Sequence, residues 1–256
     1  MKAKKRFGQN FLTDKKLLED LISLINMTSQ DKFLEIGPGK GDLTENLINF
    51  CDCYFGIEVD RDLLTVLKNR FPENKKAFIN RDILKLNPSE IYPLNKFRVI
   101  GNIPYNISSP ILDWCEKNYE KILDVHFMLQ KEFALRCIGN ERSSSYGKLS
   151  VICNYLYEVT ILKEVTKDFF NPIPKVDSLF VRFSPKKNRL DIKELQNLKK
   201  VTRALFNKKR KKISNSLEDV LHKKNISNLD LDLNLRPDEL SLEDYLQISS
   251  MVREDG

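Results

Sequence analysis

The alternation of two hydrophobic patterns constrains this chain more than any other feature of its sequence. Short apolar and β-branched runs alternate with segments of helical periodicity through the first two-thirds of the chain. Strands that alternate with helices form βαβ units, which build a parallel sheet. The expected strands are residues 33–36, 54–58, 77–81, 98–101, 125–129, 159–165 and 178–183. The expected helices between them are residues 15–25, 43–50, 62–71, 110–117, 131–138 and 149–157.

The connection between the last two expected strands differs from the others. Residues 166–177 include Pro172 and Pro174, and the segment is too short and too rich in proline for a crossover helix. A short connection of this kind joins antiparallel strands. The predicted fold class is therefore α/β: a doubly wound, mostly parallel sheet of seven strands with one antiparallel strand at that end.

The sequence changes character near Pro185, after which no strand pattern is found. The pair Ser241 and Asp244 suits the first turn of a last helix. We predict a domain at residues 1–185 and a small helical domain at residues 186–256. Apolar residues that fit a helix face in the second domain are Leu195, Leu198, Val201, Leu205, Ile213, Leu217, Val220 and Leu221.

Positive charge is concentrated in the second domain. Residues 186–224 carry 14 Lys and Arg against 4 Asp and Glu, a balance of +10, so the rest of the chain carries −3 of the total of +7. A smaller basic cluster comprises Lys2, Lys4, Lys5 and Arg6. One-sided charge favours a polyanionic partner such as nucleic acid, the alternative being a solvated lysine-rich helix.

The cysteines and the N-terminal residues indicate the cellular compartment of the protein. The five cysteines are odd in number and irregularly spaced, and Cys51-x-Cys53 lacks the spacing of a zinc site. We interpret them as packed thiols of a reducing compartment, and His126 as a core or edge residue. No apolar run approaches membrane-spanning length, and the basic N-terminus has no signal-peptide core. We expect a cytoplasmic, monomeric protein with no metal ion and no membrane contact.

A glycine-rich turn, Glu35-Ile-Gly37-Pro-Gly39-Lys-Gly41, follows the first expected strand. Glycines at a strand-to-helix turn let a ligand approach the backbone. Glu58 ends the second strand, where an acid can accept ribose hydroxyls, and Asp82 ends the third, where it can meet an adenine amino group. This set suits a nucleoside without pyrophosphate, such as S-adenosylmethionine (SAM). A nicotinamide cofactor is the rival, which the G-x-G-x-G spacing disfavours.

The stretch Asn102-Ile-Pro-Tyr105 ends the fourth expected strand. An exocyclic adenine amine is a poor nucleophile, because its lone pair is delocalised into the ring. The Asn102 oxygen and a carbonyl of Ile103 or Pro104 could accept its N–H groups and direct the lone pair at an electrophile. The Tyr105 ring could stack on the base. A second aromatic wall could come from Phe169 or Phe170 on the proline-rich loop.

Several motifs together resemble the ribosomal RNA adenine N6,N6-dimethyltransferases, and in particular the bacterial small-subunit (16S) type. They run in order over most of the chain: RFGQNFL at 6–12, EIGPGKG at 35–41, IEVDRDL at 57–63, GNIPYNISSP at 101–110, HFMLQKE at 126–132, YGKLSV at 146–151, FNPIPKVDS at 170–178 and FNKKRKKISNSL at 206–217.

The resemblance implies a Rossmann-like class I SAM-dependent methyltransferase that releases S-adenosylhomocysteine. It implies dimethylation of the N6 amines of two adjacent adenosines near the 3′ end of 16S rRNA, in the immature small subunit, with a role in its biogenesis. Asn102, Tyr105 and Phe170 would act on the target base. The basic segment, interpreted as a helix, would bind rRNA through Lys208, Lys209, Arg210, Lys211 and Lys212. The cofactor would be held by Gln9, Asn10, Leu12, Gly37, Gly39, Glu58, Asp82, Ile83 and Asn102.

Alternatives to this reading stay open at the level of sequence. The macrolide-resistance enzymes, which methylate 23S rRNA, share the SAM and NIPY features, whereas FNKKRKKISNSL and LRPDELSLEDY resemble the 16S type. Mitochondrial members also share the core, and some serve as transcription factors. A ribosome assembly factor whose occupancy of the subunit matters more than its catalysis is a further reading.

Overall fold

The computed structural model describes residues 9–186 and 191–252. The N-terminal basic cluster therefore lies outside the described residues, as do residues 6–8 of the RFGQNFL motif. The chain divides into two compact units, one made of Met1–Lys131 with Thr160–Pro185 and the other of Glu132–Val159 with Lys186–Gly256. Residues 132–159 thus group with the C-terminal part. The assignment of functional domains at 1–185 and 186–256 stays a prediction.

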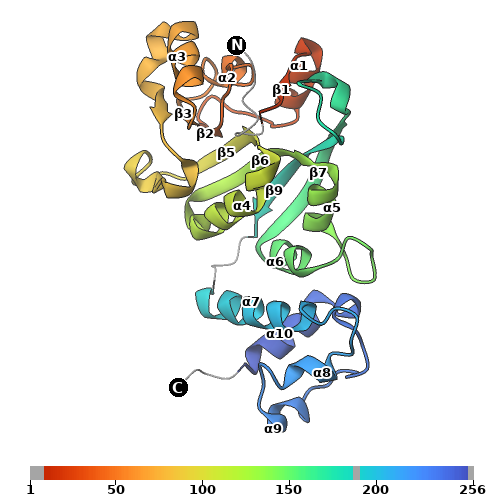
Figure 1. Ribbon diagram of the computed structural model, residues 1–256. Helices are drawn as coiled ribbons and strands as arrows, with labels where there is room; N and C mark the ends of the chain where they lie inside the picture. Colours follow the sequence, from red (N-terminus) through yellow and green to blue (C-terminus); the bar gives the residue numbers. More distant parts are fainter. Residues whose placement is uncertain (1–8, 187–190, 253–256) are drawn as a thin grey trace. The chain divides into compact units, whose positions relative to one another are not determined.

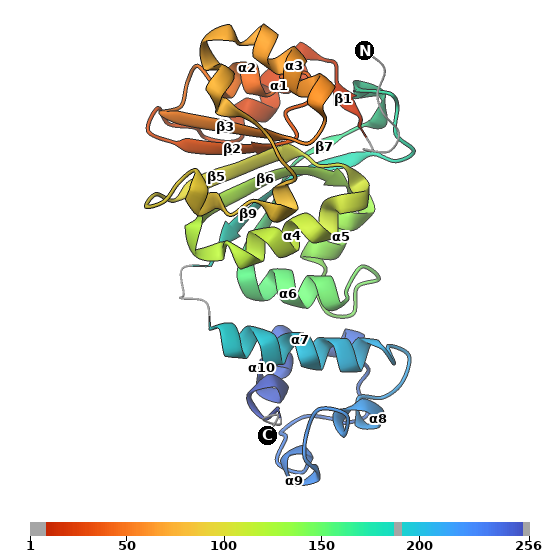
Figure 2. The ribbon, with the colours of Figure 1, turned by 60° about the vertical axis from the view of Figure 1, so that its left-hand side comes forward.

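The first unit is organised by a seven-stranded sheet with the strand order β4-β3-β2-β5-β6-β9-β7 (Figures 1 and 2). β2 is parallel to β3 and β5, β4 to β3, and β6 to β5, whereas β9 is antiparallel to β6. The predicted fold class is confirmed, including its antiparallel strand. The strands are β2 (Lys32–Ile36), β3 (Cys53–Glu58), β4 (Phe78–Asn80), β5 (Phe97–Asn102), β6 (Ile122–Gln130), β7 (Tyr157–Val165) and β9 (Ser178–Pro185).

Helices join the parallel strands, and local signals fix where two of them begin. The Asp14 carboxylate accepts the Leu17 N–H at 2.7 Å at the start of α1, and Asp60 accepts the Asp62 N–H at the start of α3. Both side chains satisfy helix N–H groups that have no carbonyl partner. The helices of this unit are α1 (Lys15–Ser23), α2 (Thr44–Leu47), α3 (Arg61–Arg70) and α4 (Ser108–Lys117).

Two short strands were not predicted. β1 (Phe11–Leu12) and β8 (Phe170–Asn171) form a separate antiparallel pair, with Phe11 opposite Asn171 and Leu12 opposite Phe170. A strand of two residues is too short to show an alternating pattern in sequence. Only the tertiary structure reveals that the N-terminal segment pairs with the proline-rich loop.

A buried ion-pair network joins the start of β5 to β6 and to the loop before β2. The Arg98 guanidinium binds both carboxylate oxygens of Asp124, at 2.9 and 2.8 Å, and Asp31 at 2.7 Å. It also donates to the carbonyls of Ile25 and Asn26. Arg98 is 7% exposed. His126 is fully buried beside this network, with Nδ1 3.5 Å from Asp124, as its apolar surroundings predicted.

The second unit is helical. Leu195, Leu198, Val201 and Leu205 are buried on α7, and Ser241 caps α10 by accepting the Asp244 N–H, as predicted. No helix of the described residues is long and apolar enough to cross a membrane. The helices are α5 (Lys131–Ile138), of which Lys131 belongs to the first unit, α6 (Lys148–Leu156), α7 (Ile192–Phe206), α8 (Ser214–Leu217), α9 (Lys223–Ile226) and α10 (Leu242–Ser250).

The interpretation of the basic segment as a helix is wrong. α7 ends at Phe206, and residues 207–212 form a turn that leads to the buried Ile213. Like charges three and four residues apart repel one another on a helix, and cations are stabilised just after a helix C-terminus. Both effects favour ending the helix before the five cations. The basic residues are therefore displayed on a turn.

Candidate functional site

The glycine-rich turn follows β2 and has a backbone that requires glycine. Gly37 and Gly39 both have φ of +64°, a conformation that L-residues with side chains rarely adopt. The Gly37 N–H donates to the Ile57 carbonyl at 2.9 Å, which holds the turn against the end of β3. A Cβ at Gly37 would meet nothing within 4 Å, whereas one at Gly39 would meet the Phe11 ring at 3.0 Å. The turn therefore leaves open space beside Gly37.

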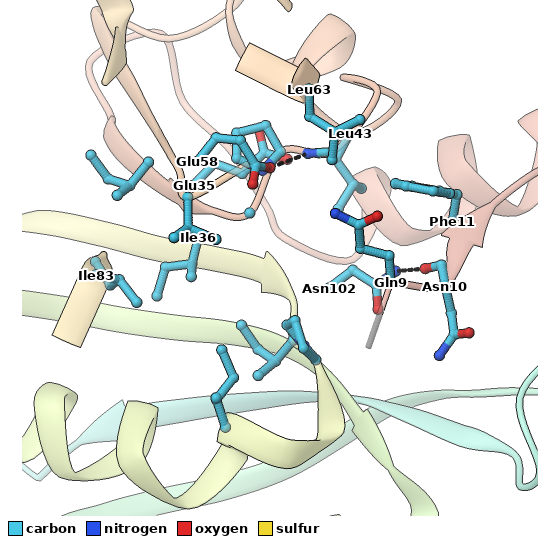
Figure 3. A pocket seen from close by; sticks show the side chains of 18 of the residues that line it. Gln9, Asn10, Phe11, Glu35, Ile36, Leu43, Glu58, Leu63, Ile83 and Asn102 are labelled. Carbon is cyan, nitrogen blue, oxygen red and sulfur yellow. Dashed lines mark hydrogen bonds between the residues drawn. The ribbon is translucent and has the colours of Figure 1, made fainter. Parts of the chain in front are cut away.

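That open space belongs to a cavity of about 270 Å³ at the carboxyl ends of the parallel strands. Figure 3 shows Glu35, Ile36 and Glu58 on one side of it, and Gln9, Asn10 and Phe11 of the N-terminal segment on the other. Ligands of open α/β sheets bind at this edge. Apolar side chains that also line the cavity are Leu43, Ile57, Leu63, Ile83 and Ile103.

The Glu58 carboxylate is held in the cavity by a hydrogen bond to each of its two oxygens. Its Oε2 accepts the Gly39 N–H at 3.2 Å, and its Oε1 accepts the Asp60 N–H at 2.9 Å. Burial raises the pKa of Glu58 above its ordinary value, and the two backbone N–H groups oppose that rise. Each carboxylate oxygen keeps a free lone pair. Glu58 can therefore accept further hydrogen bonds from a ligand's hydroxyl groups.

Asp82 lies after β4 and caps a 3₁₀ turn (Ile83–Lys85), accepting the Leu84 N–H at 3.0 Å. This bond occupies Oδ1 and leaves Oδ2 for a ligand. The neighbouring Ile83 is buried and lines the cavity. An acceptor beside an apolar surface suits a flat heterocycle that carries an amino group.

Glu35 lies at the base of the cavity and is 1% exposed. Its Oε2 accepts hydrogen bonds from the Tyr54 hydroxyl at 2.5 Å and the Thr44 hydroxyl at 2.8 Å. Burial raises the pKa of Glu35 to about 7, although both hydrogen bonds lower it. Its place in the turn motif did not by itself predict a role for Glu35.

Glu35 makes a pH-dependent contribution to stability. The unfolded chain loses this proton near pH 4.5 and the folded chain near pH 7, so folding becomes less favourable as the pH rises through that window. We expect Glu35→Gln, which keeps the acceptor oxygen but cannot ionise, to gain about 3 kcal/mol relative to the wild type between pH 4.5 and 7.5. Urea unfolding of both proteins at several pH values measures this difference. A constant difference across the window would contradict it.

Asn102 ends β5 and lines the cavity next to the N-terminal segment that contains Asn10. Its Nδ2 donates to the Asn10 main-chain oxygen at 2.7 Å (Figure 3). This bond determines the orientation of the Asn102 amide, because only its NH₂ group can donate to the Asn10 carbonyl oxygen. The Oδ1 oxygen is left as an acceptor without a hydrogen bond among the described residues.

Tyr105 follows Asn102 on a 3₁₀ turn (Tyr105–Ile107) and also lines the cavity. Its hydroxyl lies 3.0 Å from Ser178 Oγ, so the ring is anchored at its far end. Burial raises the pKa of Tyr105, which keeps the hydroxyl protonated at neutral pH. Of the two carbonyls considered as acceptors, that of Pro104 already takes the Ile107 N–H at 3.1 Å. The Ile103 carbonyl is therefore the better placed of the two.

The structure brings most of the predicted site residues around this one cavity. Phe170, in contrast, is not among the residues that line the cavity; it is 2% exposed and belongs to the apolar core together with Leu12 and Val165. Its neighbour Phe169 is 36% exposed. The predicted residues that line the cavity are Gln9, Asn10, Leu12, Gly37, Gly39, Glu58, Asp82, Ile83, Asn102 and Tyr105.

The lining residues that were not predicted include Phe11, Leu43 and Leu63. Phe11 lies within the QNFL stretch, and Leu63 within IEVDRDL. Leu43 follows the glycine turn. The motif positions were a usable signal for Phe11 and Leu63, whereas nothing in the sequence separates Leu43 from an ordinary core leucine.

The five basic residues of the predicted RNA-binding segment belong to the second unit and fall into two groups. Lys208 pairs with Asp219 at 3.1 Å, Lys209 donates to the Tyr146 carbonyl at 3.2 Å, and Lys212 donates to Asn234 at 2.8 Å. The side chains of Arg210 and Lys211 are exposed and make no ion pair or hydrogen bond within the described residues. These two are available to a polyanion.

The five cysteines are free thiols, three of them buried. In the part of the chain that the structure describes, no group of three or more His, Cys, Asp or Glu side chains is arranged to hold a metal ion.

Comparison with known proteins gives a consistent answer. The family model for ribosomal RNA adenine dimethylase matches residues 1–254. The ribosomal RNA small subunit methyltransferase A of Coxiella burnetii is 37% identical over 254 residues, which cover 98% of each chain. The crystal structure of a dimethyladenosine transferase from Plasmodium falciparum superposes with a TM-score of 0.75 at 25% identity, covering 93% of this chain and 95% of that one. The 23S rRNA methyltransferase ErmE superposes with a TM-score of 0.73 at 26% identity, covering 95% and 99%.

Proposed function

The chain belongs to the ribosomal RNA adenine dimethylase family, and from this membership we propose that it dimethylates adenine N6 amines of small-subunit ribosomal RNA. The observation that supports the proposal is the Asn102 amide, which is held by the Asn10 carbonyl and lines the cavity. The finer proposal is that the targets are two adjacent adenosines near the 3′ end of 16S rRNA in an immature subunit. We propose further that the protein acts as a cytoplasmic monomer without a metal ion.

The cavity residues fit S-adenosylmethionine as the methyl donor. The bare backbone at Gly37 leaves room that a Cβ would fill, which suits close approach by the methionyl portion. Glu58 would hold the ribose hydroxyls, and Asp82 with Ile83 would hold the adenine. When bound, the cofactor supplies an electrophilic methyl group on a sulfonium centre.

The protein's own part in the reaction is to bind, orient and polarise the target amine. Asn102 Oδ1 and the Ile103 carbonyl would accept the two N–H groups of adenine N6, so that its lone pair points at the methyl group. The Tyr105 ring, anchored through Ser178, would stack on the base. We propose that Phe170, or its partly exposed neighbour Phe169, covers the other face of the base.

Glu58 provides a direct test of the cofactor site. We expect Glu58→Ala to weaken SAM binding about 10-fold or more, because it removes a charge-assisted acceptor for the ribose and the anchor of the Gly39 N–H. Isothermal titration calorimetry measures the affinity. Unchanged affinity would remove Glu58 from the site.

The basic turn provides a test of RNA binding. We expect Arg210→Glu with Lys211→Glu to weaken rRNA binding and to reduce the slope of log affinity against log salt by about 2. Lys208→Met is the matched control, since it removes a cation that is already paired with Asp219. Filter binding over a salt series gives both slopes. An equal loss of rRNA affinity in the control would show that binding depends on the structure of the turn and not on its unpaired charges.

The experiment that tests the proposed function uses small subunits from a strain that lacks this modification. They are incubated with the purified protein and labelled SAM, and the methylated positions are mapped by mass spectrometry of RNA digests. Dimethyladenosine at an adjacent pair near the 3′ end of 16S rRNA is the expected result. Label found only on 23S rRNA would instead assign the chain to the resistance-type activity.

A further inference from the structure

Asn10 stands at a junction of three segments that are far apart in the sequence. Its main-chain oxygen accepts the Asn102 side-chain N–H at 2.7 Å. Its own side-chain amide lies between two carbonyl oxygens, 3.2 Å from that of Gln9 and 3.1 Å from that of Pro172. Because both neighbours are acceptors, the group that faces them is the NH₂. Asn10 thus links the catalytic strand β5 to the loop that follows β8.

Two of the polar groups of Asn10 are committed to these internal bonds. The main-chain oxygen accepts from Asn102 and the side-chain nitrogen donates to the two carbonyls, which leaves the side-chain oxygen and the main-chain N–H for a ligand. The resemblance-based role of Asn10, to close over SAM, does not account for this arrangement.

The position of the Asn10 carbonyl depends on how the N-terminal segment is held. From Phe11 onward, β1 pairs with β8, and the Thr13 N–H donates to the Phe169 carbonyl at 3.1 Å. Before Phe11, the side-chain bond to Pro172 is the corresponding attachment to the same loop. Gln9 donates to Asp60 at 3.3 Å, so the bond to Pro172 is the attachment that ties this part of the segment to the loop after β8.

We propose that Asn10 is a positioning residue for methyl transfer: its side chain, attached to the Pro172 carbonyl, holds the main-chain oxygen that orients the Asn102 amide. The inference rests on the proposed function. Asn102 can present Oδ1 to the target amine only while its Nδ2 has a fixed acceptor. Loss of the attachment lets the amide rotate and misplaces the acceptor oxygen, and misplacement by about 1 Å can cost about 100-fold in rate.

The test compares Asn10→Asp with Thr13→Val. Aspartate has the same shape as asparagine but turns a carboxylate toward two carbonyl oxygens, so it opposes the attachment instead of making it. Valine at position 13 removes only an exposed hydroxyl bond to Phe169 on the same segment. Thermal unfolding verifies that both variants are folded.

For Asn10→Asp we expect a single-turnover methylation rate, measured at saturating SAM, about 30- to 100-fold below that of the wild type. Thr13→Val should keep the wild-type rate. In the ¹⁵N-labelled, cofactor-free protein, the paired side-chain resonances of Asn102, identified by their absence in Asn102→Ala, should move in Asn10→Asp and stay in place in Thr13→Val.

Two results would overturn the inference. One is an unchanged single-turnover rate of Asn10→Asp at saturating SAM, which would limit Asn10 to the cofactor contact that the resemblance implies. The other is unshifted Asn102 resonances. The resonance measurement needs neither cofactor nor RNA, so it separates a failure of this inference from a failure of the proposed function, which would show as inactive wild-type protein.

Discussion

Asn102→Ala should lower the methylation rate about 10²- to 10³-fold while the protein still binds the small subunit. The substitution removes the acceptor that faces the target amine, and loss of one preorganised polar contact of this type costs about 3–4 kcal/mol in the transition state. The side chain is half-buried and its Nδ2 bond is made to a main-chain atom, so the fold retains its sheet. Single-turnover methylation and subunit binding, measured separately, resolve the two effects.

Asn102→Asp is the informative companion to the alanine variant. Aspartate keeps an oxygen acceptor but places the other carboxylate oxygen against the Asn10 carbonyl, where the wild type has a 2.7 Å hydrogen bond. We therefore expect it to be nearly as inactive as alanine. Methylation at the wild-type rate in Asn102→Ala would show that the proposed mechanism is wrong. Full activity in Asn102→Asp would show that an acceptor suffices without the attachment to Asn10.

Arg98→Leu should lower the free energy of unfolding by about 3–5 kcal/mol. Removing one partner of a buried ion pair leaves the other charges without compensation, and here two carboxylates and two carbonyls depend on one guanidinium. Although burial alone would raise it, the pKa of Asp124 is held below its ordinary value by the nearby His126 ring and by the hydrogen bonds from Arg98. The network therefore favours the ionised carboxylate, which the leucine variant leaves without its main partner.

Lys32→Met is the matched control for Arg98→Leu. Lys32 pairs with Asp52 at 2.9 Å in the same sheet, but at the surface, where the Asp52 side chain is 57% exposed. Exposed pairs contribute about 0–1 kcal/mol because water screens the charges. Urea unfolding compares the two variants. Equal small losses would show that the Arg98 network adds little to stability.

The strands and the fold class were predictable because their signals are local. A strand such as β2 is a short, mostly apolar run, and a glycine turn follows it immediately. The proline-rich connection before β9 indicated the antiparallel strand. The strand-end acids Glu58 and Asp82 could likewise be assigned to one edge, since parallel strands carry their carboxyl ends to the same side of a sheet.

The prediction that the basic segment is a helix was wrong, and the physical reason is visible in the sequence. Apolar residues at Ile213 and Leu217 continue the spacing of α7, and this hid the end of the helix at Phe206. Five successive cations oppose a helix, and that effect outweighed the hydrophobic spacing. The helix prediction rested on the hydrophobic spacing and did not take the repulsion between the cations into account.

The sequence by itself determined the α/β architecture, the glycine turn, the strand-end side chains and the family, because each depends on residues close together in the chain. The tertiary structure alone decided the orientation of Asn102, the burial of Phe170 and the pairing of β1 with β8. Each of these joins segments separated by many tens of residues. Such contacts are fixed by how the assembled sheet brings the chain together, and no local pattern records them.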